Sequence, residues 1–246
     1  MEQVRAFNPF HWVLEFAPVY ADGGFDIITG NPPWDVLASN RGEFFSRYDE
    51  QFRSYGPETK NKREAELLEQ ESISETYKKY KRNFELRAEY FNSTQDYQLQ
   101  SSTVAGQTMS RENDLSVLFL ERIFSLSRSD GYVAQVLPGF VFSGGAAKNL
   151  RMHLLENTSM KRLVMMENNG IFPGLHGQAK FGAIVFRNSG STDQLKGKFV
   201  RGDIDIFTSI ASEAVTIPED VLAQFSPEAR SFPYIESEKQ VRILRK

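Results

Sequence analysis

The sequence contains no cysteine, which excludes a disulfide framework and any metal site built from thiolates. It has only three histidines, His11, His153 and His176, and their spacing matches no metal-ligand pattern. We therefore expect no metal. No apolar run approaches the roughly 18 residues that a membrane-spanning helix needs, and no signal peptide opens the chain. The expected location is the cytoplasm, with no membrane partner.

The chain also lacks an excess of positive charge. Its formal net charge is -3 over 246 residues, which excludes a global basic footprint for nucleic acid. Any contact with DNA must then come from local patches or from another part of the enzyme. The hydrophobic content of 40% supports a real core, and the length indicates one domain or one and a half.

One stretch, residues 25–34, joins a strand pattern to a rigid polar corner. Ile27 and Ile28 are apolar and β-branched, which is typical of a strand covered on both faces. Gly30 and the two prolines that follow end the strand, and Asn31 is biased to an extended conformation because it precedes proline. The carboxyl end of a strand is where open α/β sheets bind ligands.

The residues of this corner suit chemistry on an exocyclic amine, whose lone pair is delocalised into its ring. The side-chain carbonyl of Asn31 and the backbone carbonyl of Pro32 would accept from the two N–H bonds and localise the pair. Pro33 would shape the corner. Trp34 offers a flat face on which an extruded base stacks, worth roughly 1–3 kcal/mol. The alternative is that these residues form only a turn after a strand.

The tetrapeptide at residues 31–34 resembles the catalytic motif of S-adenosylmethionine-dependent amino-methyltransferases, above all the DNA adenine-N6 enzymes. The string Phe-His-Trp-Val-Leu-Glu-Phe at residues 10–16, with Gly-Phe-Asp at 24–26, resembles the methylase part of the Eco57I-like restriction–modification enzymes. This resemblance extends to about Asn188. The tetrapeptide alone is shared with RNA and protein-glutamine methyltransferases, and the leading string favours DNA.

The resemblance implies an adenine-specific DNA methyltransferase with S-adenosylmethionine as cofactor and DNA as partner. It implies catalytic roles for Asn31, Pro32, Pro33 and Trp34, and cofactor contacts for Asn31 and Pro33. Two other functions stay open. The chain could be a catalytically silent nucleic-acid-binding or assembly module, or it could belong to an RNA or protein-glutamine N-methyltransferase. No nuclease pattern of an acid pair followed by acid-x-lysine is found.

The expected fold class is α/β, as part of a Rossmann-like methyltransferase sheet, namely its C-terminal half with an antiparallel last strand. Further strands are predicted at residues 132–137, 161–168 and 181–187. The last two have no helix between them, which implies an antiparallel pair. By resemblance, the loop before the final strand faces the target base. Phe181 is then a second base-contacting aromatic, or equally a core residue, and His176 and Lys180 lie near the DNA.

A charged insertion at residues 35–113 interrupts the sheet pattern. Residues 58–92 have helical character with mixed charge, which is typical of a solvated helix face. The alternative is that the tyrosines and cations at residues 77–82 contact a DNA backbone. Residues 93–112 are predicted to form a loop, and the aromatic-rich residues 1–24 to pack onto the sheet.

After the insertion, an amphipathic helix is predicted at residues 114–129, with Asp114 as its N-cap or a first-turn acid and Asp-Gly at 130–131 as its end. The glycines at 139–145 indicate a turn into a helix at 146–156. We divide the chain into residues 1–188, the methyltransferase part, and 189–246, an extension or the start of a target-recognition region.

The glycine-rich turn that holds the cofactor in the resembled family is missing upstream of the motif, where only 24 residues precede the first strand. We therefore expect half of a methyltransferase domain, inactive alone, from a longer or naturally split protein. The remaining N-terminal half would be its partner. The strand at residues 25–30 would be an unpaired edge, open to self-association.

Overall fold

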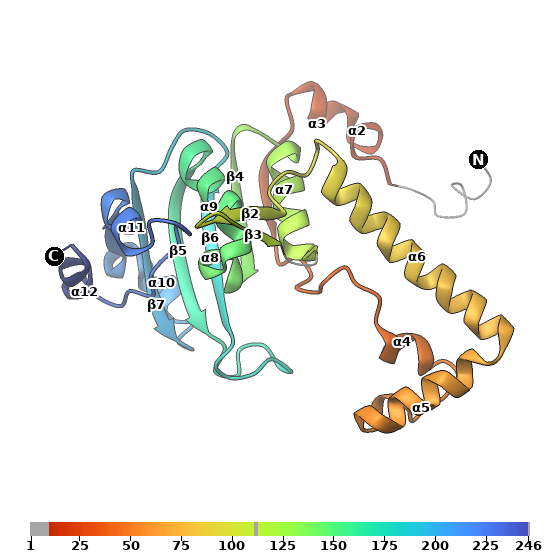
Figure 1. The fold of residues 1–246 in the computed structure, drawn as a ribbon. Helices are drawn as coiled ribbons and strands as arrows, with labels where there is room; N and C mark the ends of the chain where they lie inside the picture. The colour runs from red at the N-terminus through yellow and green to blue at the C-terminus, as the bar shows by residue number, and fades with distance from the viewer. Residues whose placement is uncertain (1–9, 111–112, 246) are drawn as a thin grey trace.

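The computed structural model describes residues 10–110 and 113–245 and contains a mixed six-stranded sheet, with the order β1-β4-β6-β5-β7-β8 (Figure 1). A two-stranded hairpin, β2-β3, lies apart from it. The strands are β1 (Phe25–Gly30), β2 (Ser101–Val104), β3 (Gln107–Ser110), β4 (Ser127–Pro138), β5 (Ser159–Glu167), β6 (Lys180–Arg187), β7 (Gln194–Arg201) and β8 (Val215–Pro218).

The strand directions follow the predicted pattern. β1 and β4 are parallel, whereas β6 is antiparallel to both of its neighbours, β4 and β5. β1, β4, β5 and β7 therefore run the same way, with β6 and β8 reversed. The short connection between β5 and β6 contains no helix, so the chain can only turn back on itself. The predicted α/β class with an antiparallel strand is confirmed, and residues after 188 add β7 and β8 to the same sheet.

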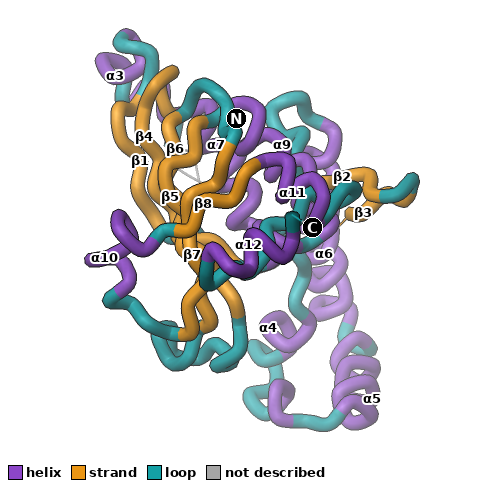
Figure 2. Tube along the Cα trace, turned by 90° about the vertical axis from the view of Figure 1, so that its left-hand side faces the viewer, coloured by secondary structure: helices purple, strands orange, loops and turns teal. Residues whose placement is uncertain are grey.

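Helices cover both faces of the sheet (Figure 2). α7, α9 and α11 lie on one face, and α10 lies on the other. The helices are α2 (Trp12–Glu15), α3 (Ala17–Ala21), α4 (Arg41–Phe45), α5 (Pro57–Leu68), α6 (Glu71–Ser93), α7 (Leu115–Leu126), α8 (Phe140–Ser143), α9 (Lys148–Asn157), α10 (Ile206–Glu213), α11 (Glu219–Phe225) and α12 (Glu238–Leu244), with 3₁₀ turns at Phe52–Ser54 and Gly145–Ala147.

The two faces of the sheet bury two separate sets of side chains, because successive residues of a strand point to opposite faces. In β4, Val133 and Leu137 join the large core beneath α7 and α9, whereas Val136 packs with the cluster beneath α10. This alternation decides which groups near the carboxyl end of β1 can meet.

The prediction that β1 is buried on both faces is wrong. Ile27 is 67% exposed, and its neighbour across the ladder, Tyr132, is 46% exposed. Only Ile28, on the opposite face, packs against the main core. The reason is that β1 ends the sheet and, among the described residues, pairs with β4 alone. The predicted free edge is therefore present.

The N-terminal aromatic residues form their own small cluster beside this edge rather than a buried layer. Residues 1–9 lie outside the described part of the chain. Trp12 and Phe16 stack at 5.9 Å between ring centroids, and both contact Phe25 at the start of β1. Neither α2 nor α3 has a buried residue, so the segment leaves much apolar surface uncovered.

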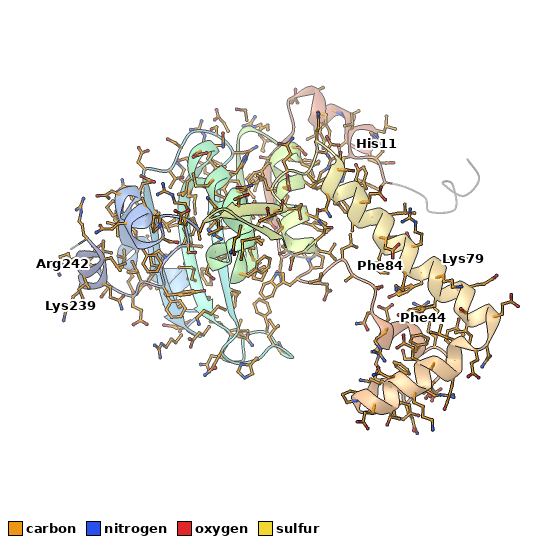
Figure 3. All side chains as sticks on the ribbon, viewed as in Figure 1. His11, Phe44, Lys79, Phe84, Lys239 and Arg242 are labelled. Carbon is orange, nitrogen blue, oxygen red and sulfur yellow. The ribbon has the colours of Figure 1, made fainter. Side chains whose placement is uncertain are left out.

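The charged insertion forms a helical arm, α4 to α6, that projects from the sheet (Figure 1). The predicted helical character of residues 58–92 is confirmed, with a break between α5 and α6. Figure 3 shows Phe44 inside the arm and Lys79 on its outer side. Tyr77 and Tyr80 pack on Phe44 at 4.8 and 5.1 Å between ring centroids. These tyrosines therefore belong to the core of the arm, and a contact of its lysines with DNA stays a prediction.

Two segments near the arm differ from their predictions. The predicted loop over residues 93–112 contains the hairpin β2-β3, whose turn residues Ala105 and Gly106 both have positive φ, as a tight two-residue turn requires. The predicted helix over residues 114–129 is confirmed from its Asp114 cap onward, but it ends at Leu126. Ser127 already pairs with Phe25, so the strand begins before the Asp-Gly pair.

One buried cation joins the C-terminal segment to the sheet's first half. Arg151 of α9 is fully buried and donates four hydrogen bonds of 2.5 to 2.9 Å to backbone carbonyls. Two of these carbonyls belong to Val141 and Gly144, and two to Ala229 and Arg230. Burial lowers the pKa of Arg151 to about 10, still far above neutral pH, so the side chain stays charged. Among the described residues no carboxylate pairs with it.

We expect Arg151→Met to destabilise the fold by about 3–5 kcal/mol, because it removes four hydrogen bonds to buried or partly buried backbone carbonyls. Urea unfolding followed by circular dichroism measures the change. Arg242→Met, which alters an exposed arginine of α12, is the matched control and should shift stability by less than about 0.5 kcal/mol. Equal effects of the two substitutions would contradict this role of Arg151.

Candidate functional site

The corner at residues 31–34 lies at the carboxyl end of β1 and is held in place from the far side of the insertion. Leu115 donates its backbone N–H to the carbonyl of Asp35 at 2.9 Å, and Leu37 donates to the carbonyl of Asn113 at 2.7 Å. Val36 forms an isolated antiparallel bridge with Asp114. The chain leaving the corner is therefore tied to the start of α7.

Within the corner, the exposed and buried residues alternate. Asn31 and Pro33 are exposed, whereas Pro32 is buried and Trp34 is half-buried. No hydrogen bond from the described residues occupies the side-chain amide of Asn31. The amide carbonyl is thus available to an external donor, as amine chemistry at this position requires.

The corner passes from one face of the sheet to the other. Gly30 stands beside Gln135 in the ladder, on the face covered by α7. Trp34 instead packs with Val136 and Phe181 in the cluster on the opposite face. Asn31 lies between these two environments. A group on each side of the sheet's end can therefore approach the same asparagine.

On the α7 face, the corner borders a cleft of about 510 Å³, within the usual range of ligand pockets. Gly30, Asn31 and Pro33 line one end of it. The walls are mostly apolar and come from β1, α7 and the end of α6. The other lining residues are Trp12, Ile28, Thr29, Pro32, Phe91, Tyr97, Leu115, Leu118, Phe119, Arg122, Ile123, Leu126 and Gln135.

On the opposite face, Trp34 is the centre of an aromatic group. Its ring lies 5.4 Å from that of Phe172 and 6.0 Å from that of Phe181, between centroids. Its indole N–H donates to the carbonyl of Val136 at 3.4 Å. These contacts fix the indole plane while part of its surface stays accessible. A fixed, partly exposed indole can accept a stacking base.

The loop between β5 and β6 carries Phe172 and is organised by one buried amide. Asn168, fully buried, donates to the carbonyls of Phe172 and Leu175 at 3.1 and 3.0 Å. Its side-chain oxygen accepts from the backbone N–H of Phe172 at 2.6 Å. β1 and β5 run in the same direction, so their carboxyl ends lie at the same edge of the sheet. The loop after β5 therefore meets the corner after β1 at that edge.

The structure brings together only some of the predicted substrate residues. Phe181 is 4% exposed and contacts Trp34, which favours its interpretation as a core residue. His176 is exposed on the same loop. Lys180 precedes Phe181 in β6, so its side chain lies on the other face, where its ammonium group is 5.0 Å from the ring centroid of Tyr234. DNA contacts of His176 and Lys180 stay predictions.

Two residues of the site were not singled out from the sequence. Gln135 is 3% exposed, lines the cleft, and has a buried side-chain nitrogen without a partner among the described residues. The sequence signal that could have identified Gln135 was a lone amide at an inward position of an apolar strand. The second residue is Asn168, whose role depends on a loop conformation that no local sequence pattern specifies.

Two further classes of site were searched for within residues 10–110 and 113–245. No group of three or more His, Cys, Asp or Glu side chains there could hold a metal ion. No helix among those residues is both long and apolar enough to cross a membrane.

Comparison with known proteins gives a family. A protein-family model described as Eco57I restriction-modification methylase matches residues 2–172. A putative type II restriction enzyme and methyltransferase of Methanocaldococcus jannaschii is 36% identical over 50 residues, which are 20% of this chain and 4% of that protein. The chain thus matches only a small part of that relative's length.

Solved structures give weaker similarity. A type I restriction-modification methyltransferase subunit from Streptococcus thermophilus is 13% identical, with a TM-score of 0.47 over 92% of this chain and 41% of that one. A modification subunit of a putative type I restriction enzyme from Vibrio vulnificus is 16% identical, with a TM-score of 0.40 over 73% and 26%. The fold described above rests on this chain's own strands.

We expect Asn168→Ala to loosen the loop that carries Phe172 and to destabilise the fold by about 1–3 kcal/mol, because buried backbone groups lose their partner. In a Trp12→Phe background, the emission of Trp34 should shift to longer wavelength as water reaches the indole. Gln178→Ala, an exposed change in the same loop, is the control. Unchanged Trp34 emission in Asn168→Ala would contradict the role of the amide.

Proposed function

Because this chain belongs to the Eco57I restriction-modification methylase family, we propose that it carries the catalytic corner of a methylase that modifies adenine N6 in DNA. The cofactor would be S-adenosylmethionine. The observation that supports this most directly is the position of Asn31, exposed between a ligand-sized cleft on one face of the sheet and the aromatic group of Trp34 on the other.

The proposed role of the corner is to make an aromatic amine nucleophilic. The Asn31 side-chain carbonyl and the Pro32 backbone carbonyl would accept from the two N–H bonds of the amine, which draws the nitrogen towards tetrahedral geometry. Fixed proline φ angles hold the second carbonyl in place. Such preorganised acceptors need no strong base, so catalysis would come from positioning and electrostatics.

The residues of the cleft fit the proposed cofactor. The cleft's volume suits a ligand of that size, its walls are apolar and aromatic, and its floor carries a buried amide that lacks a partner among the described residues. Asn31 and Pro33 line it, as expected for cofactor contacts. When bound, S-adenosylmethionine supplies the methyl group, while the cleft residues orient the ligand and exclude water.

The target base would approach from the opposite side. Trp34 would stack on an adenine turned out of the duplex, and Phe172 and Phe181 would hold the indole in place. Pro33 would fix the angle between the donor side and the base side. A base on one side and a methyl donor on the other would then meet at the Asn31 carbonyl.

The free edge of β1 suggests how the cleft is completed. The strand presents unpaired backbone groups beside the exposed Ile27, and apolar residues of α2 lie next to it. Such an edge pairs readily with another strand. We propose that a segment supplying the glycine-rich half of the methylase domain pairs here, and that this chain alone is inactive. Self-association through the same edge is the competing outcome.

We expect Asn31→Ala in the whole natural protein to lower methyl transfer by at least about 10²–10³-fold, the usual loss when one preorganised polar group is removed from an active site. Incorporation of tritiated methyl groups into duplex DNA, single-stranded DNA and RNA measures both the rate and the substrate class. Binding of S-adenosylhomocysteine by calorimetry should stay within a few-fold of wild type.

The matched control is Asn157→Ala, which alters an exposed asparagine at the end of α9. It should transfer methyl groups at the wild-type rate. Full activity of Asn31→Ala would refute the proposed role of the corner, and preferential methylation of RNA would refute DNA as the substrate.

We expect Trp34→Ala to weaken stacking on the target base by about 1–3 kcal/mol, whereas Trp34→Phe retains most of it. A duplex with 2-aminopurine at the target position reports this directly, since its fluorescence rises when the base leaves the stack. If Trp34→Ala and wild type extrude the base equally, Trp34 does not hold it.

A further inference from the structure

The floor of the cleft contains a polar group that the fold does not use. Gln135 lies in β4 with apolar residues two positions away on either side, Val133 and Leu137, on the same face of the sheet. It is 3% exposed, and its side-chain nitrogen makes no hydrogen bond within the described residues. Both N–H bonds of that amide nitrogen are therefore without an acceptor.

An unpaired buried amide lowers the stability of the folded protein. A leucine at this position would continue the apolar pattern of the strand without that cost. A buried polar group that lowers stability is usually retained in a protein only where function requires that group. Within the described part of the chain, no helix end or turn supplies an acceptor for the Gln135 side-chain nitrogen.

The position of Gln135 connects it with the proposed reaction centre. Its ladder partner is Gly30, the residue immediately before Asn31. A side chain at position 30 would begin 3.5 Å from the Gln135 nitrogen and would cover the amide from the side of β1. Glycine places no side chain between β1 and the amide. Gln135 and Asn31 both line the cleft.

The face of the sheet decides which ligand Gln135 can meet. Trp34, the proposed base-stacking residue, lies on the opposite face with Val136. Gln135 and Ile28 are on the α7 face, where the cleft is. An adenine stacked on Trp34 is separated from Gln135 by the sheet itself. The ligand within reach of the amide is the one that occupies the cleft.

We propose that Gln135 is a binding residue for the methyl donor and that its amide N–H donates to an oxygen acceptor of that nucleoside–amino-acid ligand. This inference rests on the proposed function. Two kinds of oxygen group on the ligand have the required chemistry, the ribose hydroxyls and the amino-acid carboxylate. In either case the orphaned N–H bonds gain an acceptor only in the complex, so the amide favours the bound state over the free one.

The first test is the stability of the free protein. Gln135→Leu and the near-isosteric Gln135→Met remove the unpaired amide, so the melting temperature of the whole natural protein should stay the same or rise by about 2–4 °C. Gln224→Leu, the same chemical change at an exposed position of α11, is the matched control. A fall in melting temperature in both Gln135 variants would show a structural role and overturn the inference.

The second test is ligand binding by calorimetry with S-adenosylhomocysteine and with 5′-methylthioadenosine, which keeps the ribose but lacks the amino acid. Both Gln135 variants should bind S-adenosylhomocysteine about tenfold more weakly than wild type or Gln224→Leu. A matching loss with 5′-methylthioadenosine assigns the acceptor to the nucleoside part, which carries the ribose hydroxyls. An unchanged affinity for that ligand assigns it to the carboxylate.

The outcomes separate the two proposals. If wild type binds both ligands and the Gln135 variants bind them equally well, the inference about Gln135 fails while the proposed function stands. If wild type, in the whole natural protein, binds neither ligand, the proposed function fails and the inference fails with it.

Discussion

The whole arrangement depends on one backbone constraint, the pair of prolines directly after β1. With two φ angles fixed, two backbone N–H donors missing and the preceding asparagine held extended, the chain cannot continue as a paired strand. It passes around the end of the sheet instead, so that Asn31 borders the cleft on the α7 face and Trp34 packs on the other. The hydrogen bonds from residues 113–115 hold the exit of the corner.

This constraint explains why part of the site was predictable. The corner, the strand before it and the Asp114 cap are local features, in which residue type alone limits the backbone. The antiparallel strands β5 and β6 followed from a connection too short for a crossover. Those features are enough to predict the α/β class and the position of Asn31. They do not predict the neighbours of Trp34, which come from β4, β6 and the loop before β6, more than a hundred residues later.

The failures of prediction have physical causes of a different kind. The apolar residues of β1 predicted a buried strand, but the burial of a strand depends on what packs against it. In the structure β1 has one free edge and one uncovered face. The hairpin β2-β3 was missed because its strands are rich in Ser, Thr and Gln, which are typical of loops. Gln135 was overlooked because nothing in a strand sequence shows whether an amide finds a partner.

The two ends of the arm meet where Leu37 bonds to Asn113 and Val36 bridges to Asp114. All of α4, α5 and α6 lies between these contacts and has its own aromatic cluster, separate from the sheet's. The entropy cost of closing a flexible loop at such a point rises only slowly with the length of the loop. Evolution can therefore lengthen, shorten or exchange this segment among related enzymes without moving the asparagine next to it, which makes the arm a natural place for lineages to diverge.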